Sequence, residues 1–177
     1  MATTIKQTES IPSSYPDVPE DLSSDAAALD SDAIWQRIES YVAHRWSSRG
    51  VIWIAEGPGE WVPPLAMTEI DLIEIWDAGW TTATPDASPL GGYELLDATY
   101  RFAGTVGFGV DLPAAVSEAF RRLAEYLAEA DHAPGSNSHT LNLGSYSETI
   151  DRAPNWRARA LQLSGAADLL RPYRKVS

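Results

Sequence analysis

The apolar positions of the chain recur with a helical period in three stretches, and the clearest lies between Asp111 and Ala130. There they follow one another at three- and four-residue steps, which places them on one side of a 3.6-residue helix. We expect this helix to pack that side against a partner surface. Pro113 falls in the opening turn, where its missing N–H costs nothing, and Asp111 is expected to accept hydrogen bonds from the first free amides. The stripe comprises Leu112, Val116, Ala119, Phe120, Leu123, Tyr126 and Leu127.

A second helix is predicted from Ser31 or Asp32 to about Trp46. Ser31 is its expected N-cap, acidic residues occupy its first turn, and Gly50 is expected to stop the helical segment. Its apolar stripe comprises Ile34, Trp35, Ile38, Tyr41, Val42 and Trp46.

A third helix is predicted from Asn155 to about Leu170. It follows Pro154 and ends before Pro172, because proline interrupts the helical hydrogen-bond ladder. Gly165 weakens its middle.

Between the predicted helices at 31–46 and 111–130, the spacing of apolar residues shortens to the two-residue period of strands. The segment 51–55 and the segment 60–64 flank a Gly-Pro-Gly turn, which predicts a hairpin-like unit. In 68–76 the apolar face slips by one residue, which indicates a bulged strand or one buried on both faces. Short strands are also expected at 93–96 and 99–103. The segment 77–92 reads as loop, and a long loop after 130 has one expected strand at 141–143.

These elements predict an α+β fold that is mainly helical, with three main helices forming a bundle and a small antiparallel β element. Extended arms are expected at both ends. We divide the chain into an acidic N-terminal arm at 1–30, one domain at 31–170 and a basic C-terminal tail at 171–177. The arm is rich in Ser, Thr, Pro and Asp, so it is either a solvated tail or ordered by docking onto a partner or another copy.

The charge distribution narrows the possible partners. The net charge is -12, which argues against a groove that grips nucleic acid through its phosphates. Residues 1–33 carry seven acids against one lysine, whereas residues 151–177 carry six Lys and Arg against two Asp. The chain has no cysteine, so disulfides and thiolate metal sites are excluded. The sequence also offers neither a signal peptide nor a run of about 18 apolar residues, so we expect cytoplasmic synthesis and no membrane span.

Motifs of catalysis are missing from the sequence. His44, His132 and His139 do not stand at metal-ligand spacing, and neither a G-x-S-x-G nor a Walker A motif is present. We therefore expect no enzyme, cofactor or metal. Tryptophans and acids are interspersed in 53–80, a combination that a glycan-binding module would use, so such a module stays an alternative.

Two segments resemble the head-tail connector, or adaptor, family of tailed bacteriophages and gene transfer agents. DLPAAVSEAFRRLAEYLAEA is similar to the family's proline-initiated helix, and SGAADLLRPYRKV is similar to its Leu-Leu, Pro-Tyr-Arg ending. The resemblance covers about 33–176. The domain predicted at 31–170 would accordingly be the connector domain of this family. The acidic arm and the loop 133–148 depart from shorter members of the family.

The resemblance implies a structural virion protein of the neck, which lies at the head-tail interface. Such proteins form a ring, commonly of twelve copies, that joins the portal to stopper or tail proteins and continues the DNA conduit without specific DNA binding. Another neck protein, a stopper or tail terminator, is the nearest alternative, and it should be richer in β-structure with weaker helices. The residues carried over as portal contacts are Leu169, Leu170, Pro172, Tyr173, Arg174, Lys175 and Val176.

Overall fold

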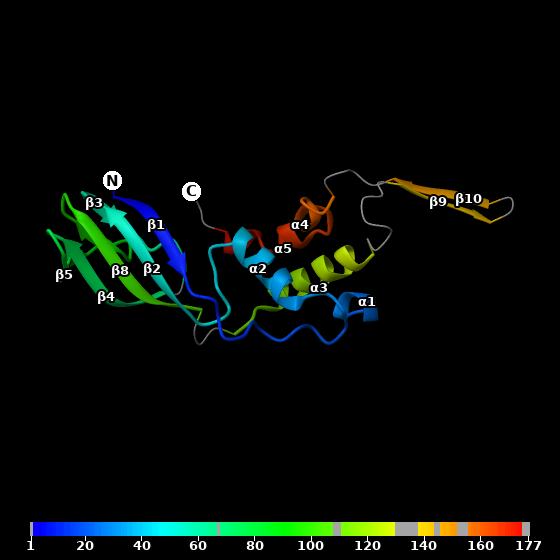
Figure 1. Cartoon of the computed structure of the whole chain (residues 1–177), viewed down its shortest axis with the longest axis horizontal. Coiled ribbons are helices and arrows are strands. Elements are labelled where there is room, and N and C mark those ends of the chain that lie inside the picture. Colours follow the sequence, from blue (N-terminus) through cyan, green and yellow to red (C-terminus); the bar gives the residue numbers. More distant parts are fainter. Residues whose placement is uncertain are drawn as a thin grey trace. The chain divides into compact units, whose positions relative to one another are not determined.

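The computed structural model describes residues 2–66, 68–107, 111–129, 138–143, 146–151 and 156–174, of which 138–143 and 146–151 are described by their backbone alone. The chain divides into two compact units (Figure 1). We call them the sheet unit, built from Met1–Pro16, Val42–Leu112 and Tyr173–Ser177, and the helical unit, built from Asp17–Tyr41 and Pro113–Pro172. Each is described by itself.

The sheet unit is built on a five-stranded antiparallel sheet. Its strands are, in spatial order, β1 (Thr3–Glu9), β2 (Arg49–Glu56), β8 (Thr99–Val106), β4 (Thr68–Trp76) and β5 (Trp80–Thr82). Along β2 and β8 buried residues alternate with more exposed ones, as expected for a sheet with one covered face. The pairing register slips between Ile70 and Leu72, which confirms the bulge predicted in β4.

A second, smaller antiparallel sheet contributes to the same core. It contains β3 (Gly59–Trp61), β7 (Tyr93–Leu95) and β6 (Asp86–Ala87), in that order. The Trp61 ring stacks on Phe102 of β8 with centroids 4.0 Å apart, and Trp53 of β2 meets Trp61 edge to face at 5.9 Å. All three rings are almost completely buried. Aromatic packing therefore forms the centre of the sheet unit.

The N-terminal strand β1 supplies polar partners to this aromatic core. The Trp53 indole Nε1 donates to Gln7 Oε1 at 2.7 Å, and the Trp61 indole Nε1 donates to Thr4 Oγ1 at 2.8 Å. Glu9, at the end of β1, pairs with Arg45 at 2.6 Å. Residues predicted as an arm therefore form an edge strand of the main sheet.

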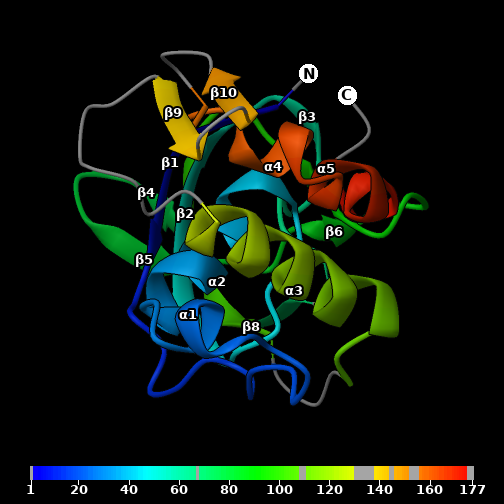
Figure 2. The same ribbon diagram turned by 90° about the vertical axis from the view of Figure 1, so that its right-hand side faces the viewer.

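The helical unit is arranged around one long helix, α3 (Ala114–Ala128) (Figure 2). Its other elements are α1 (Ser24–Ala27), α2 (Ser31–Tyr41), α4 (Ala160–Leu163), α5 (Ala166–Leu169), the first part of the 3-10 helix η1 (Arg171–Tyr173), and the hairpin of β9 (Ser138–Leu143) and β10 (Tyr146–Asp151). Trp35 of α2 packs on Phe120 of α3 with ring centroids 4.8 Å apart. Leu123 is fully buried, so α3 turns the predicted face to the core.

The predicted fold class was wrong. Two antiparallel sheets dominate the structure, and within the described residues only α2 and α3 are helices of seven residues or more, so there is no three-helix bundle. The predicted helix at 155–170 is two short helices on either side of Gly165, whose φ of +75° is a left-handed conformation that interrupts a helix. Nor is the N-terminal region an extended arm, since it contains β1 and α1.

Three local predictions also changed. The segments 51–55 and 60–64 do not form a hairpin, because β2 pairs with β1 and β8 whereas β3 pairs with β7. The helix from Ser31 ends at Tyr41 rather than Trp46, and the side chain of Asp30 accepts from the first amides in place of Ser31. Asp111 does not cap α3, since the N-cap is Pro113 and no side chain bonds there.

Candidate assembly surfaces

The predicted portal-contact residues fall into different environments. Leu170 is fully buried, and Leu169 of α5 and Tyr173 of η1 are partly buried. Pro172 and Arg174 are exposed. Lys175 and Val176 lie outside the described residues. Three of the seven predicted contact residues, Leu169, Leu170 and Tyr173, are therefore at least partly buried within this chain.

Tyr173 is anchored in the sheet unit by its backbone and its ring. Its carbonyl accepts a hydrogen bond from the Ala43 amide at 2.9 Å and lies 3.1 Å from His44 Nδ1. The ring meets His44 and Trp46 edge on, with centroids 5.3 and 5.7 Å away. His44, one of the scattered histidines, therefore contacts the C-terminal segment. Arg174 is one of the residues that line a groove of about 380 Å³ beside His44.

The solvent-facing strip of α3 carries an ion-pair network. Glu118 accepts from Arg121 Nε at 2.8 Å and Nη2 at 2.7 Å, and from Arg122 Nε at 2.7 Å. These hydrogen bonds, first from Arg121 and then from Arg122, lower the pKa of Glu118 to about 2, and the same carboxylate raises the pKa of Arg121. The middle of the strip therefore carries two arginines that share one carboxylate.

One side of α3 is bordered by an acidic segment. Residues 17–32 carry six Asp and Glu and no Lys or Arg, and all six acids are exposed. The segment is fixed to α3 at Glu125, which accepts from the Ser23 amide and from its hydroxyl, both at 2.7 Å, and these bonds lower the pKa of Glu125. Ser23 also caps α1 through Ala26. We call residues 17–32 the acidic flank.

The opposite charge gathers on residues 156–171, which we call the basic flank. Arg157, Arg159 and Arg171 are exposed there, against one acid, Asp168. The basic flank is held to the unit by the Trp156 ring, which meets Tyr126 of α3 at 6.0 Å, and by the Arg157 carbonyl, which accepts from Arg37 of α2. In the part of the chain that the structure describes, neither Arg159 nor Arg171 makes an ion pair.

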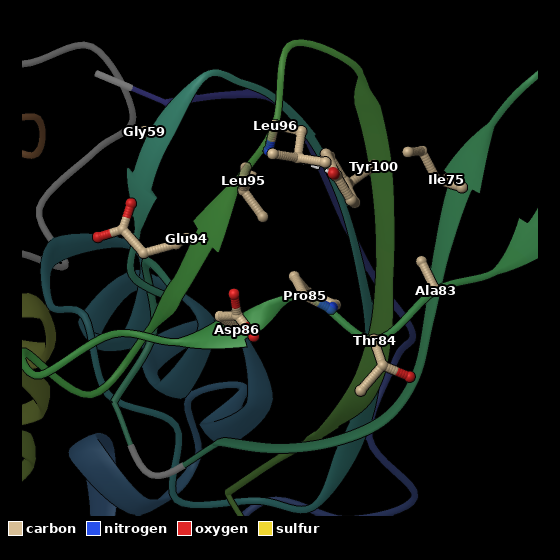
Figure 3. A pocket seen from close by; sticks show the side chains of 10 residues that line it. All are labelled: Gly59, Ile75, Ala83, Thr84, Pro85, Asp86, Glu94, Leu95, Leu96 and Tyr100. Carbon is tan, nitrogen blue, oxygen red and sulfur yellow. Dashed lines mark hydrogen bonds between the residues drawn. The ribbon is translucent and has the colours of Figure 1, made fainter.

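Within the described residues, no group of three or more His, Asp and Glu side chains is placed so that it could hold a metal ion. His132 lies outside the described residues, and only the backbone of His139 is described. A cavity of about 370 Å³ opens in the sheet unit beside Leu95 and Tyr100 (Figure 3). Its two acids, Asp86 and Glu94, are cross-strand partners, but the Glu94 carboxylate points away from the cavity, so no facing carboxylate pair results.

The tryptophans and acids of 53–80 do not line a common cleft. Trp53 and Trp61 belong to the buried core. Trp76 is 51% exposed and meets Trp80 edge to face at 5.2 Å, while Arg101 lies over the Trp80 ring at 4.6 Å. The two surface tryptophans therefore contact each other edge to face, and the arginine lies over one of them.

The comparisons with known proteins return nothing that classifies the chain. No model of a protein family matches it, and no curated protein sequence matches it significantly. Within the described residues, no helix is long and apolar enough to cross a membrane.

Sequence reasoning found the charge of both flanks but missed their apolar features. The acidic flank borders a small pocket formed by Val18, Leu22 and Ala26 together with Ile34 and Phe120 of the core helices. No sequence signal links these residues, because 17–27 and 120 meet only through the packing of α1 on α3.

Proposed function

We propose that the chain is a structural protein of a phage neck, an adaptor that forms a ring beneath the portal. The observation that carries this proposal is the packing of α3 with α5. The two segments with the adaptor resemblance are more than thirty residues apart in sequence, yet most of each belongs to the helical unit, where Arg122 of α3 lies beside Gly165. Segments that define one functional element are expected to fold together.

The electrostatics support the same role. A wall of like charge keeps a passing duplex from adhering, and the chain carries a net charge of -12. Oppositely charged flanks on one unit suit contacts between copies or with a portal.

A second candidate, a stopper or tail terminator, is favoured by one observation. Such proteins were expected to be rich in β-structure, and antiparallel sheets dominate this chain. The strands of those sheets lie in the sheet unit, however, and most of the two segments with the adaptor resemblance lies in the helical unit. We therefore place the adaptor first.

The deciding experiment is the native mass of the purified protein, alone and mixed with the portal ring or the tail proteins of the same genome. A ring, or a monomer that joins the portal at one copy per portal subunit, is the result expected of an adaptor. Binding to tail proteins without binding to the portal would favour the second candidate. A monomer that ignores all of them would overturn the proposal.

The portal-contact assignment has its own test. Truncation after Leu170 would also remove Tyr173, whose carbonyl accepts from Ala43. Truncation after Arg174 is cleaner, because it removes Lys175, Val176 and Ser177 and keeps that anchor. We expect this variant to keep the wild-type melting temperature while its affinity for the portal falls at least tenfold. Undiminished portal binding would remove Lys175 and Val176 from the contact set.

A further inference from the structure

The acidic and basic flanks lie on two different sides of α3. In the helical unit α1 packs against α3 from one side, and α4 and α5 pack against it from another (Figure 2). On the helix surface the contact points differ accordingly: Glu125 holds the acidic flank, whereas Arg122 and Tyr126 face the elements of the basic flank. One copy therefore presents a negative and a positive surface in different directions.

Each flank also exposes one large apolar side chain. Val18, within the acidic flank, is 45% exposed, and Leu163, within the basic flank, is 47% exposed. In the described part of the helical unit, no other large apolar side chain reaches that degree of exposure. An exposed apolar group within a polar, charged segment matches the usual composition of an interface, which has an apolar centre and a polar rim.

The acidic flank also borders a small pocket that could accept an apolar side chain from another copy. The pocket beside Val18 is lined by Ser31 and by apolar residues, with Phe120 and Ile34 among them, and has a cavity volume of about 20 Å³. That is room for about one group of the size of a water or a methyl. One terminal methyl of an exposed leucine from another molecule fits this size, and the acids of the acidic flank would attract a partner that brings arginines.

From these three observations we propose that copies of this chain join head to tail through the helical unit. The basic flank of one copy lies on the acidic flank of the next, Leu163 enters the Val18 pocket, and Arg159 and Arg171 face Asp17 and Glu20. Because donor and receptor surfaces differ, the contact is heterologous and repeats around a ring instead of closing a two-fold dimer. This inference rests on the proposed ring-forming function and names the contact that builds the ring.

Charge reversal with complementation tests the pairing directly. The acid-reversed variant carries Asp17→Lys and Glu20→Lys, and the base-reversed variant carries Arg159→Glu and Arg171→Glu. All four side chains are exposed and bear no ion pair within the described residues, so folding should be kept. We expect each variant alone to self-associate at least tenfold more weakly than wild type, alone or on the portal, and an equimolar mixture to recover assembly.

The matched control reverses two exposed acids of the sheet unit, Asp86→Lys and Asp97→Lys, and should assemble like wild type. Recovery by mixing is the outcome that a merely structural effect cannot produce, since two misfolded variants do not repair each other. If wild type forms rings and neither reversal changes them, the proposed contact is wrong and the adaptor function stands. If wild type never associates with itself or with the portal, both fail.

A cysteine pair gives a second, geometric readout. The chain has no cysteine, so Val18→Cys combined with Leu163→Cys introduces the only two thiols. A disulfide requires Cβ atoms roughly 3.5 to 4.5 Å apart. Mild oxidation of the assembled double variant should give a ladder of linked chains that reducing agent dissolves, and each single variant should stay unlinked. Linked dimers with nothing larger, or no linking of an assembled ring, would overturn the head-to-tail contact.

Discussion

The two units bury the same kind of side chain in different ways. Trp53 of the sheet unit and Trp35 of the helical unit are both fully buried. The Trp53 indole N–H donates to Gln7, whereas the Trp35 indole N–H has no partner among the described residues. The difference arises because the edge strand β1 places a polar side chain next to the Trp53 indole N–H. The apolar helix interface around Trp35 offers no such acceptor. Equal burial therefore does not mean equal stabilisation.

The largest expected effects come from truncating the aromatic centre of each unit. Phe102→Ala and Phe120→Ala each remove a side chain that is at most 1% exposed, and each should lower the free energy of unfolding by about 3 to 5 kcal/mol. Urea denaturation measures the loss. Hydrogen exchange followed by mass spectrometry should place the loss of protection in the unit that carries the substitution. A loss below about 1 kcal/mol for either variant would show that its ring is not packed as described.

Gln7→Leu should make Trp53 resemble Trp35. The indole N–H would lose its acceptor while staying buried, which costs about 1 to 3 kcal/mol. Thr8→Leu, at an exposed neighbouring position of the same strand, is the matched control and should change stability by less than about 0.5 kcal/mol. Equal effects of the two substitutions would mean that the Gln7 to Trp53 hydrogen bond contributes nothing.

A pH-dependent contribution is expected from Glu9 of the sheet unit. Burial tends to raise its pKa, but hydrogen bonds and charge from Arg45, with help from Gln7 and Arg49, outweigh burial and leave the pKa below 4.5. The folded state therefore favours the carboxylate, so its contribution is present above pH 4.5 and is lost as the pH falls below that value.

Glu9→Gln provides the measurement. We expect the variant to be about 1 to 2 kcal/mol less stable than wild type at pH 7, because Arg45 and Arg49 lose their charged partner. The gap should shrink as the pH is lowered below 4.5. A gap that stays constant down to pH 3 would contradict the assignment.

The smallest effect is expected from Trp35→Phe. This change removes an unpaired buried N–H, which offsets the cavity left by the smaller ring, so the stability should change by less than about 1 kcal/mol. Trp53→Phe is its counterpart and should cost more, since it deletes a hydrogen bond that is made. If the two substitutions had equal effects, the comparison between the units would lose its basis.

The sequence predicted elements well where the signal is local. The apolar stripe of 111–130 gave the buried face of α3, and the slipped face of 68–76 gave the β4 bulge. Partners of strands were harder, because alternation marks a strand without naming its neighbour: β3 pairs with β7, more than thirty residues later. The strand β1 carried almost no apolar signal, since its residues are mostly polar and its partner strand supplies the hydrophobic surface.

Single residues decided two other outcomes. Gly165 divides a stretch whose apolar positions still look helical, because periodicity does not register a left-handed φ. The sequence showed that the C-terminal segment of the candidate surface is basic. It did not show that the Tyr173 ring packs on Trp46 and His44, because those residues lie some 130 positions away in the chain. The pocket at Val18 likewise depends on Phe120, which no local pattern connects to it.

The path of the chain between its two units has a consequence for how the molecule can be cut. The backbone passes from one unit to the other four times, at 16–17, 41–42, 112–113 and 172–173. A protease that nicks any one of these crossings leaves both units joined by peptide bonds at the other three. Genetic dissection meets the same obstacle, because neither unit corresponds to one continuous stretch of codons. Either unit can be produced alone only from a rewired gene that joins its separate segments through new linkers.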